Sequence, residues 1–461
     1  MNIALDDRIG RLVEEFKLEA LRCSEYRIKT TTCSVLFYFS PGNLTATSNQ
    51  QPNICAFLRV GKELLDFSSA RLLLDNKEVN FKLKEFTLSY LPETPLSYGS
   101  HTGKVKVKDS SGTMEEFNWS FLIEDELKDY SFSYGIPHSH TSYSDGLGTP
   151  TEAYEKARES GLNFLVITDH QGRLVNMRTN YDRSILVSGS QHPKWKMLKL
   201  EAASMNSKYK DFIALSGFEL STRFWGHINI INSENIIETK PSNLGELYQW
   251  LCTEDNILLS INHPHRSPRT LPFSHNFDNF VNLYEVGNGS TTREYNRTEQ
   301  NYYAALDDGW HLAAINGQDN HADDWGDSNN VTAVISKELS VDDLINAVKL
   351  RRVYSTESKS LKLVVKGNNK WMGSIINLNK EDTLELHILA EDKDNHINKI
   401  QVVSNGGKII EEKFFNNGSK CEYNLELKIN NDYSWYVVKV IHVDEKISIS
   451  SAIFVQSLKF S

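Results

Sequence analysis

The chain has 461 residues, of which 39% are hydrophobic and 24% are charged. These values are typical of folded proteins, so the composition excludes disorder throughout, and the length excludes a single small module. Fifty basic residues against 60 acidic ones give a formal net charge of −10. This charge argues against a protein that holds extended nucleic acid by bulk electrostatics, so an anionic substrate must meet locally placed cations.

The cysteines and the N-terminal sequence predict a cytoplasmic protein. The five cysteines are scattered and lack the spacing of a zinc clip, so we expect reduced thiols rather than a disulfide framework. The opening sequence MNIALDDRIGRLVEEF carries acidic residues where a signal peptide has a basic start and an apolar run. No apolar stretch of membrane-spanning length is found, so no membrane association is expected.

Three segments are expected along the chain. Residues 1–132 begin with an amphipathic helix over residues 9–20 and continue as strands, with a hairpin around residues 109–112, which predicts a β-sandwich. Residues 133–358 alternate short apolar runs with helical patterns, which is typical of βα units around a parallel sheet or barrel. Residues 359–461 return to alternation with period two, which predicts a second β-sandwich.

The middle segment predicts a series of strands and helices. The strands are expected at residues 164–168, 212–215, 228–231, 257–261, 281–286, 312–315 and 331–335. Thr149-Pro150-Thr151-Glu152 is a capping box with proline at the first helical position, so a helix is expected to begin there. Further helices are expected at residues 244–252, 293–306 and 341–350.

Histidines and carboxylates gather at the ends of these predicted strands. Ten of the 14 histidines fall between His138 and His321. In a βα barrel, the carboxyl ends of the strands form the face on which active sites are built. The candidate residues in chain order are His138, His140, Asp145, His170, Glu219, His227, His263, Asp319 and His321.

These residue types suit metal ligands. His138 and His140 are two positions apart, which places both imidazoles on one side of an extended backbone. A lone histidine at a strand end is more often a hydrogen-bonded core residue. Burying so many ionisable groups together, however, costs on the order of several kcal/mol per group unless divalent cations satisfy them. Nitrogen and oxygen donors without thiolate suit zinc, manganese or iron.

This series of residues resembles the PHP superfamily, the polymerase and histidinol phosphatase metallohydrolases, and all nine expected ligand positions are filled. The resemblance covers residues 133–358 and implies a distorted (β/α)7 TIM-like barrel, here flanked by N- and C-terminal β-sandwiches. It also implies up to three divalent transition metals, Mn, Fe or Zn. The flanking β regions, residues 284–288 and residues 331–355 resemble, more loosely, the carbaryl-hydrolase-like multidomain branch.

The resemblance further implies how the ligands are grouped. The first metal would lie among His138, His140, Glu219 and Asp319. Glu219 would also bind a second metal, held in addition by His227 and His263. The third metal would take Asp145, His170 and His321.

Hydrolysis of a small phosphomonoester or phosphodiester is the reaction expected of such a site. Coordination lowers the pKa of water from about 15.7 to about 7, so a hydroxide bridging two metals can attack phosphorus near neutral pH. A nucleotide or a short oligonucleotide is included among the expected substrates. Two alternatives stay open: a metal-dependent carbamate, ester or amide hydrolase, and a non-catalytic metal-containing binding protein.

Five further residues are candidates for supporting roles. Arg173, Arg223 and Arg266 follow ligand-bearing elements and are candidate anion binders. His265 is either a proton donor to the leaving group or a structural residue. Asp169 is expected to support His170 or a neighbouring ligand through a hydrogen bond, or to cap a turn, rather than to bind a metal.

Overall fold

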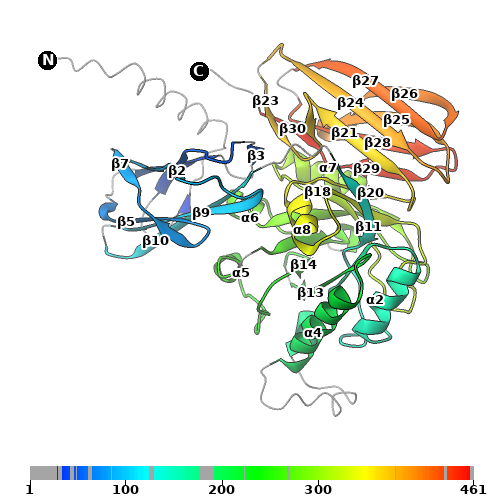
Figure 1. The fold of residues 1–461 in the computed structure, drawn as a ribbon, viewed down its shortest axis with the longest axis horizontal. Helices are drawn as coiled ribbons and strands as arrows, with labels where there is room; N and C mark the ends of the chain where they lie inside the picture. The colour runs from blue at the N-terminus through cyan, green and yellow to red at the C-terminus, as the bar shows by residue number, and fades with distance from the viewer. Residues whose placement is uncertain are drawn as a thin grey trace.

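The computed structural model describes residues 28–29, 34–41, 46–47, 49–60, 65–84, 86–109, 111–123, 129–175, 192–222, 224–254, 256–266, 270–378, 380–429 and 433–456. The predicted helix at residues 9–20 and the candidate Arg223 lie outside these residues. Figure 1 shows the N-terminal strands in blue at the left, a central part that contains helices, and the C-terminal strands in orange and red at the upper right.

The N-terminal strands form two five-stranded sheets. The first sheet has the order β1 (Ile28–Lys29), β2 (Ser34–Ser40), β4 (Ile54–Val60), β8 (Thr87–Tyr90), β7 (Lys82–Lys84). The second has the order β3 (Ala46–Thr47), β10 (Met114–Ile123), β9 (Gly99–Lys108), β5 (Asp66–Leu74), β6 (Lys77–Val79). The predicted hairpin is confirmed, since β9 and β10 pair antiparallel. A core that includes Phe117 and Trp119 lies between the sheets.

The central part is built on one curved run of paired strands. Their spatial order is β18 (Ala313–Gly317), β16 (Val281–Asn288), β15 (Leu258–Asn262), β14 (His227–Ile231), β13 (Ile213–Ser221), β12 (Phe164–Ile167), β11 (Ser131–Ile136), β19 (Val331–Ser336). Each predicted strand of the middle segment is present, and β11 is an additional strand that the apolar pattern did not predict.

The sheet is mixed, which corrects the expectation of a parallel sheet or barrel, while the distorted (β/α)7 barrel implied by the resemblance stays a prediction. β13, β14 and β15 pair antiparallel in succession, and β19 pairs antiparallel with β11. Only residues 222–226 connect β13 to β14, which is too short for the helical crossover that parallel strands require. Within the described residues, no ladder joins β18 and β19; instead, Asn316 N donates to Thr332 Oγ1 and Asn316 Nδ2 donates to Val331 O. The protein therefore has a sheet-rich, mixed α/β fold.

Most of the helices cover the outer face of this sheet, whereas the helix at Val341–Lys349 packs against its inner side chains. The helices are α2 (Pro150–Glu159), α3 (Gln171–Val175), α4 (Pro193–Lys208), α5 (Leu244–Leu251), α6 (His275–Asp278), α7 (Glu299–Asp307), α8 (Val341–Lys349) and the short 3₁₀ helix η2 (Pro264–Arg266). The predicted capping box is confirmed, because Thr149 and Glu152 bond each other's backbone N–H groups. The predicted helix at residues 293–306 begins only at Glu299, because Asn296–Arg297 forms β17, which pairs with β16.

Two apolar layers result from the alternation of side chains along the strands. Phe164 and Val166 of β12 belong to an inner cluster with residues of β13, β15, β16 and β18. Leu165 and Ile167 of the same strand pack outward against the helices. The inner layer fills the curved sheet, so the polar strand ends are the part left open for a site.

The C-terminal strands form a sandwich that is continuous with the central sheet. One sheet has the order β22 (Lys370–Trp371), β21 (Lys362–Gly367), β24 (Thr383–Glu391), β27 (Lys420–Lys428). The other continues from β19 through β20 (Val353–Thr356), β29 (Ile447–Ser450), β28 (Trp435–His442), β25 (Ile397–Ser404) and β26 (Lys408–Gly418). β23 (Ile375–Asn377) and β30 (Ile453–Gln456) also join it. The domain limits at 132/133 and 358/359 stay predictions.

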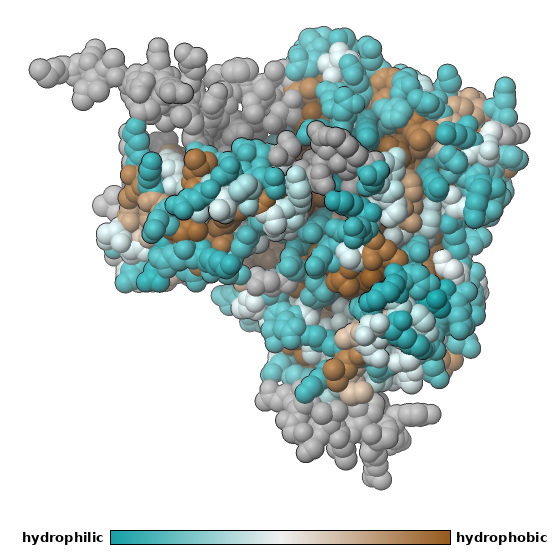
Figure 2. Space-filling model, viewed as in Figure 1, coloured by the Kyte–Doolittle hydropathy of each residue, from teal (hydrophilic) through white to brown (hydrophobic). Residues whose placement is uncertain are grey.

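The visible surface is mainly hydrophilic, with scattered apolar patches rather than one continuous band (Figure 2). Among the described residues, each helix is too short or too polar to cross a membrane.

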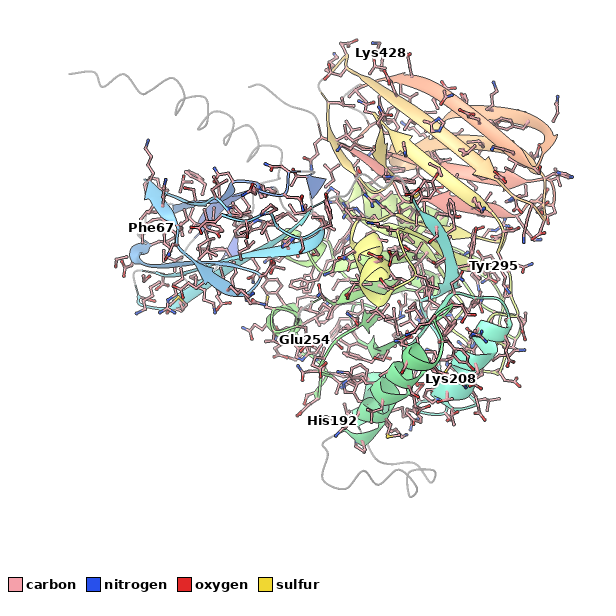
Figure 3. All side chains as sticks on the ribbon, in the orientation of Figure 1. Phe67, His192, Lys208, Glu254, Tyr295 and Lys428 are labelled. Atoms are coloured by element: carbon pink, nitrogen blue, oxygen red, sulfur yellow. The ribbon has the colours of Figure 1, made fainter. Side chains whose placement is uncertain are left out.

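Tyr295, which Figure 3 labels at the right of the central part, donates a hydrogen bond to Asn316 Oδ1 over 3.1 Å. This bond joins the loop after β16 to the end region of β18.

Candidate metal centre

The ends of the central strands bring all nine candidate residues together. Each member of the cluster lies in a strand of the central sheet or in the segment that follows one. In the part of the chain that the structure describes, three groups of side chains have ligand atoms within 4.8 Å of one another. The groups are His140 with Asp145, His170 and His321; His138 with Glu219 and His263; and His138 with His140 and Asp319. His227 is in none of these groups but contacts Glu219.

Backbone pairing holds the strand ends in register. Ser139 pairs with Asn320, and His170 pairs with Glu219, as isolated β-bridges. Asp319 N donates to His138 O over 3.0 Å, so two cluster residues are tied together through the main chain. Asp319 and His263 have φ values of 52° and 25°. Such backbone strain costs on the order of 1–3 kcal/mol and is typical of functional sites.

Glu219 is the central carboxylate of the cluster, and its side chain is 1% exposed. Its Oε1 lies 3.0 Å from His227 Nδ1 and 3.0 Å from His263 Nε2. Its Oε2 lies 2.9 Å from His170 Nδ1. One carboxylate therefore faces three imidazoles through both of its oxygens, as a ligand that bridges two cations does.

The two histidines of the HxH pair face Asp319. The Nε2 atoms of His138 and His140 lie 3.2 Å apart. Asp319 Oδ1 lies 3.5 Å from the first and 3.2 Å from the second. Two ring nitrogens and one carboxylate oxygen thus point to a common centre, which suits a cation.

Asp145 lies at the open rim of the cluster, where its side chain is 45% exposed. Its oxygens lie 3.5 Å from His170 Nε2 and 3.4 Å from His321 Nε2. His140 Nδ1 is 3.9 Å from the same carboxylate. This group corresponds to the expected third metal, with His140 added to it.

The electrostatics of the cluster follow from its burial. Burial disfavours a charged imidazole, but Glu285 and Asp319 outweigh this effect and raise the pKa of His138 to about 9. Burial is likewise outweighed at His170, where Asp145 and Glu219 raise the pKa to about 10. At Glu219, burial favours the neutral acid, but bonds from the surrounding histidines hold its pKa well below the ordinary value. Protons on these histidines therefore compete with a cation for the same lone pairs.

The donor set fits divalent transition metals. It consists of imidazole nitrogens and carboxylate oxygens without thiolate, and most of these side chains are buried. In the described structure, His263 Nδ1 is a buried ring nitrogen without a hydrogen-bond partner. Cations would offset the cost of burying this many ionisable groups side by side. The number and identity of the metals stay predictions.

Asp169 supports a loop rather than His170. It is fully buried and accepts hydrogen bonds from Thr141 N over 2.8 Å and Thr141 Oγ1 over 2.6 Å. Ser144 Oγ donates to the same carboxylate. Burial raises the pKa of Asp169 above its ordinary value. These bonds hold the segment between His140 and Asp145, so Asp169 acts on two candidate ligands through the loop that joins them.

The basic side chains predicted to act on the substrate differ in their distance from the cluster. Arg266 Nη1 donates to Asp319 Oδ2 over 2.6 Å, so this arginine is at the cluster. Arg173 lies on α3 with an exposed side chain. His265 is exposed on η2, and burial together with the nearby Arg266 lowers its pKa.

Two residues at the site were not predicted from the sequence. Arg293 donates to Asp319 Oδ2 over 2.8 Å, beside Arg266. It was placed in a predicted helix, whereas the structure has it in the loop after β16. Glu285 lies in β16, is fully buried and contacts His138 Nδ1 over 2.6 Å. A carboxylate inside a predicted central strand was the available signal, because burial of a charge requires a partner.

The chain has only distant similarity to the solved structures described below. No protein-family model and no curated protein matches the chain. One similar solved structure is a two-domain protein from Bacteroides vulgatus containing a predicted PHP-like metal-dependent phosphoesterase. It has 16% identity and a TM-score of 0.41, over 71% of this chain and 97% of that one. Another is an amidohydrolase from Chromobacterium violaceum with bound sulfate, with 16% identity and a TM-score of 0.27, over 41% and 88% of the two chains. Likenesses this distant leave the chemistry to be argued from the site itself.

Proposed function

We propose that this chain is a metal-dependent phosphoesterase of the PHP type that acts on a small phosphomonoester or phosphodiester. The observation that carries the proposal is the position of two arginines at the edge of the candidate metal centre. Arg266 and Arg293 both bond Asp319 Oδ2, while Oδ1 of the same carboxylate faces the HxH pair. Cationic side chains and metal-ligating side chains thus meet at one residue.

The arginines are suited to bind the substrate anion. Their side chains are 38% and 34% exposed, so each guanidinium keeps donors that a ligand can reach. Guanidinium groups bind phosphate oxygens with paired, charge-assisted hydrogen bonds. A phosphoryl group beside Asp319 would therefore contact both arginines while it faces the metal-ligating cluster.

The surrounding residues then orient and protonate the substrate. Cations held by the cluster would activate water and polarise the phosphoryl oxygens. Arg266 and Arg293 would fix the orientation of the phosphoryl group and stabilise the negative charge that develops on it. His265 is exposed on η2 next to Arg266 and would donate a proton to the leaving-group oxygen. Burial and Arg266 lower its pKa, so the protonated form is a minority species near neutral pH.

The test is hydrolysis of an aryl phosphate by protein loaded with manganese. We expect His140→Ala and Asp319→Ala each to lower kcat/KM at least about 100-fold, because each removes a group that faces the proposed cations. His311→Ala is the matched control, since His311 bonds Asp278 rather than a member of the cluster. Unchanged hydrolysis in both cluster variants would overturn the proposal.

The same assay addresses the alternative reaction. A carbamate, ester or amide hydrolase, in which the same hydroxide would attack a carbonyl carbon, would act on an uncharged group and would not need two arginines at the metal centre. An aryl phosphate and an aryl carbamate are therefore compared side by side. Faster turnover of the carbamate would favour that alternative. Hydrolysis of neither substrate by metal-loaded protein would favour a binding protein.

A further inference from the structure

Glu285 is a buried carboxylate at the candidate metal centre that none of the expected ligand groups includes. It lies in the middle of β16, and its side chain is 0% exposed. Its Oε1 is 2.6 Å from His138 Nδ1. Its Oε2 accepts from His263 N over 2.5 Å and from Asn288 Nδ2 over 2.8 Å. Both oxygens are thus bonded to the protein rather than directed to the common centre.

The contact with His138 determines which ring nitrogen is available to a metal. An ionised carboxylate can only accept hydrogen bonds, so His138 Nδ1 must carry the proton and donate it. The other nitrogen, Nε2, then keeps its lone pair when the ring is neutral. It is this Nε2 that faces His140 and Asp319. Histidine ligands generally have their second nitrogen held in this way, and the partner also raises their basicity.

The contact with His263 acts on the backbone of a second candidate ligand. His263 has a φ of 25°, a conformation that a non-glycine residue adopts only when its surroundings hold it there. The hydrogen bond from His263 N to Glu285 is such a restraint. Because His138 and His263 share one metal-binding group with Glu219, a single carboxylate holds two members of that group.

Gly317 leaves the space that Glu285 occupies. A Cβ atom at residue 317 would lie 1.9 Å from Glu285 Oε1 and 2.5 Å from its Cδ. Gly317 is at the end of β18, which pairs in parallel with β16. Any larger residue here would push the carboxylate away from His138. The glycine on one strand and the glutamate on the next therefore act as a pair.

We propose that Glu285 is a positioning residue for the metal centre, which orients His138 through Nδ1 and His263 through its backbone, and that Gly317 is required because it accommodates this carboxylate. The inference rests on the metal site of the proposed function but not on the reaction. It concerns the affinity for the cation, so it can be tested without a substrate.

The test compares manganese affinity in Glu285→Gln and in the unsubstituted chain. Glutamine keeps the shape of the side chain but loses the charge, so we expect the dissociation constant for Mn²⁺ to rise about 10- to 100-fold. It is measured by titrating metal-free protein and following the midpoint of the metal-induced rise in Tm. Asp392→Asn is the matched control, because Asp392 is an equally buried carboxylate bonded to a histidine, His442, outside the cluster.

A purely structural role for Glu285 predicts a different result. Glu285→Gln would then lower the Tm of the metal-free protein, as Asp392→Asn is expected to do, while both variants bound Mn²⁺ with unchanged affinity. That outcome would overturn the inference and leave the proposed function intact. Tight, Glu285-dependent binding without hydrolysis of any phosphoester would have the opposite meaning, since the positioning role would stand and the proposed function would fail.

A double variant tests whether Gly317 acts through Glu285 or whether its substitution only disturbs the fold in general. Gly317→Ala alone is expected to weaken Mn²⁺ binding about as much as Glu285→Gln, because the new methyl group displaces the carboxylate. In a Glu285→Ala background, the same change should have little further effect, since the group it collides with is gone. Equal, additive losses in both backgrounds would contradict the pairing of Gly317 with Glu285.

Discussion

Asp319 uses its two carboxylate oxygens for two kinds of partner. Oδ1 faces the imidazoles of His138 and His140, and Oδ2 accepts from Arg266 and Arg293. Its pKa is lowered because these histidines outweigh the effect of burial, so the carboxylate stays ionised. A single residue therefore connects the metal-ligating half of the site to the half that suits an anion.

We predict that Arg293→Met raises KM for an aryl phosphate about 10- to 100-fold, because a hydrogen bond to a charged group contributes about 1.5–3 kcal/mol. Manganese affinity should stay within about threefold of the original, since Arg293 is not one of the candidate ligands. Steady-state kinetics and metal titration provide the two measurements. Arg158→Met, which removes an exposed arginine paired with Asp211, is the control and should change neither. An unchanged KM would remove Arg293 from the substrate site.

At the scale of elements, short connections position the ligands more than the helices do. The segment from His140 to Gly148 carries Asp145 and leads directly into α2, whose first turn is closed by the Thr149 and Glu152 capping box. Ser142 N donates to Gly148 O over 2.8 Å, which closes this segment on itself. The position of Asp145 therefore depends on a loop that is anchored at its far end by the start of a helix.

We expect Thr149→Ala to lower the free energy of unfolding by about 1 kcal/mol, the usual cost of losing an N-cap side chain. Thermal unfolding of metal-free protein measures this change. Thr113→Ala serves as a control, because Thr113 is an exposed loop residue far from any helix start. No destabilisation relative to that control would show that the capping box contributes little to this helix.

At the scale of the whole molecule, the N-terminal apolar core is separate from the others, whereas the central and C-terminal cores share residues of both parts. One cluster contains only residues of the N-terminal sandwich. The main central cluster instead includes Trp435 and Phe454 from the C-terminal strands, and the C-terminal cluster includes Ala333 and Tyr354. The N-terminal sandwich meets the central part across a cavity of about 100 Å³ beside Glu254, a residue labelled in Figure 3.

Two unfolding transitions are therefore expected by calorimetry, one for the N-terminal sandwich and one shared by the rest. His101 in β9 distinguishes them, because its ring bonds Asp75 and Ser97 O. Burial opposes the charge on His101, but these partners outweigh it and raise its pKa. A raised histidine pKa stabilises the fold fully below about pH 6.5 and loses this contribution as pH rises through the folded-state value.

Raising the pH from about 6 to about 8 should consequently lower the Tm of the N-terminal transition. In His101→Gln this decrease should be smaller, while the second transition keeps its own pH dependence. A single transition for the whole chain would contradict the separation of the cores. A Tm of the N-terminal transition that falls with pH as much in His101→Gln as in the unsubstituted chain would contradict the assignment to His101.

The linear sequence was sufficient for many of the central elements and for the list of candidate ligands. Apolar periodicity and capping residues predicted most of the central strands and the starts of α2, α5 and α8, because these depend on neighbours along the chain. The same strand ends revealed the histidines and carboxylates that the fold brings together. These local signals predicted β14 as a strand but not its antiparallel direction, and they missed the late start of α7, since strand direction and the pairing of β17 depend on partners distant in sequence.

Only the tertiary structure decided which side chains meet. It placed Arg293 beside Arg266, moved Asp169 from a histidine partner to the loop after His140, and set Glu285 against His138 and Gly317. These contacts join residues separated by tens to more than a hundred positions along the chain. The partner of a carboxylate cannot be identified from the sequence alone, because the energy that selects the partner arises only when folding removes both groups from water.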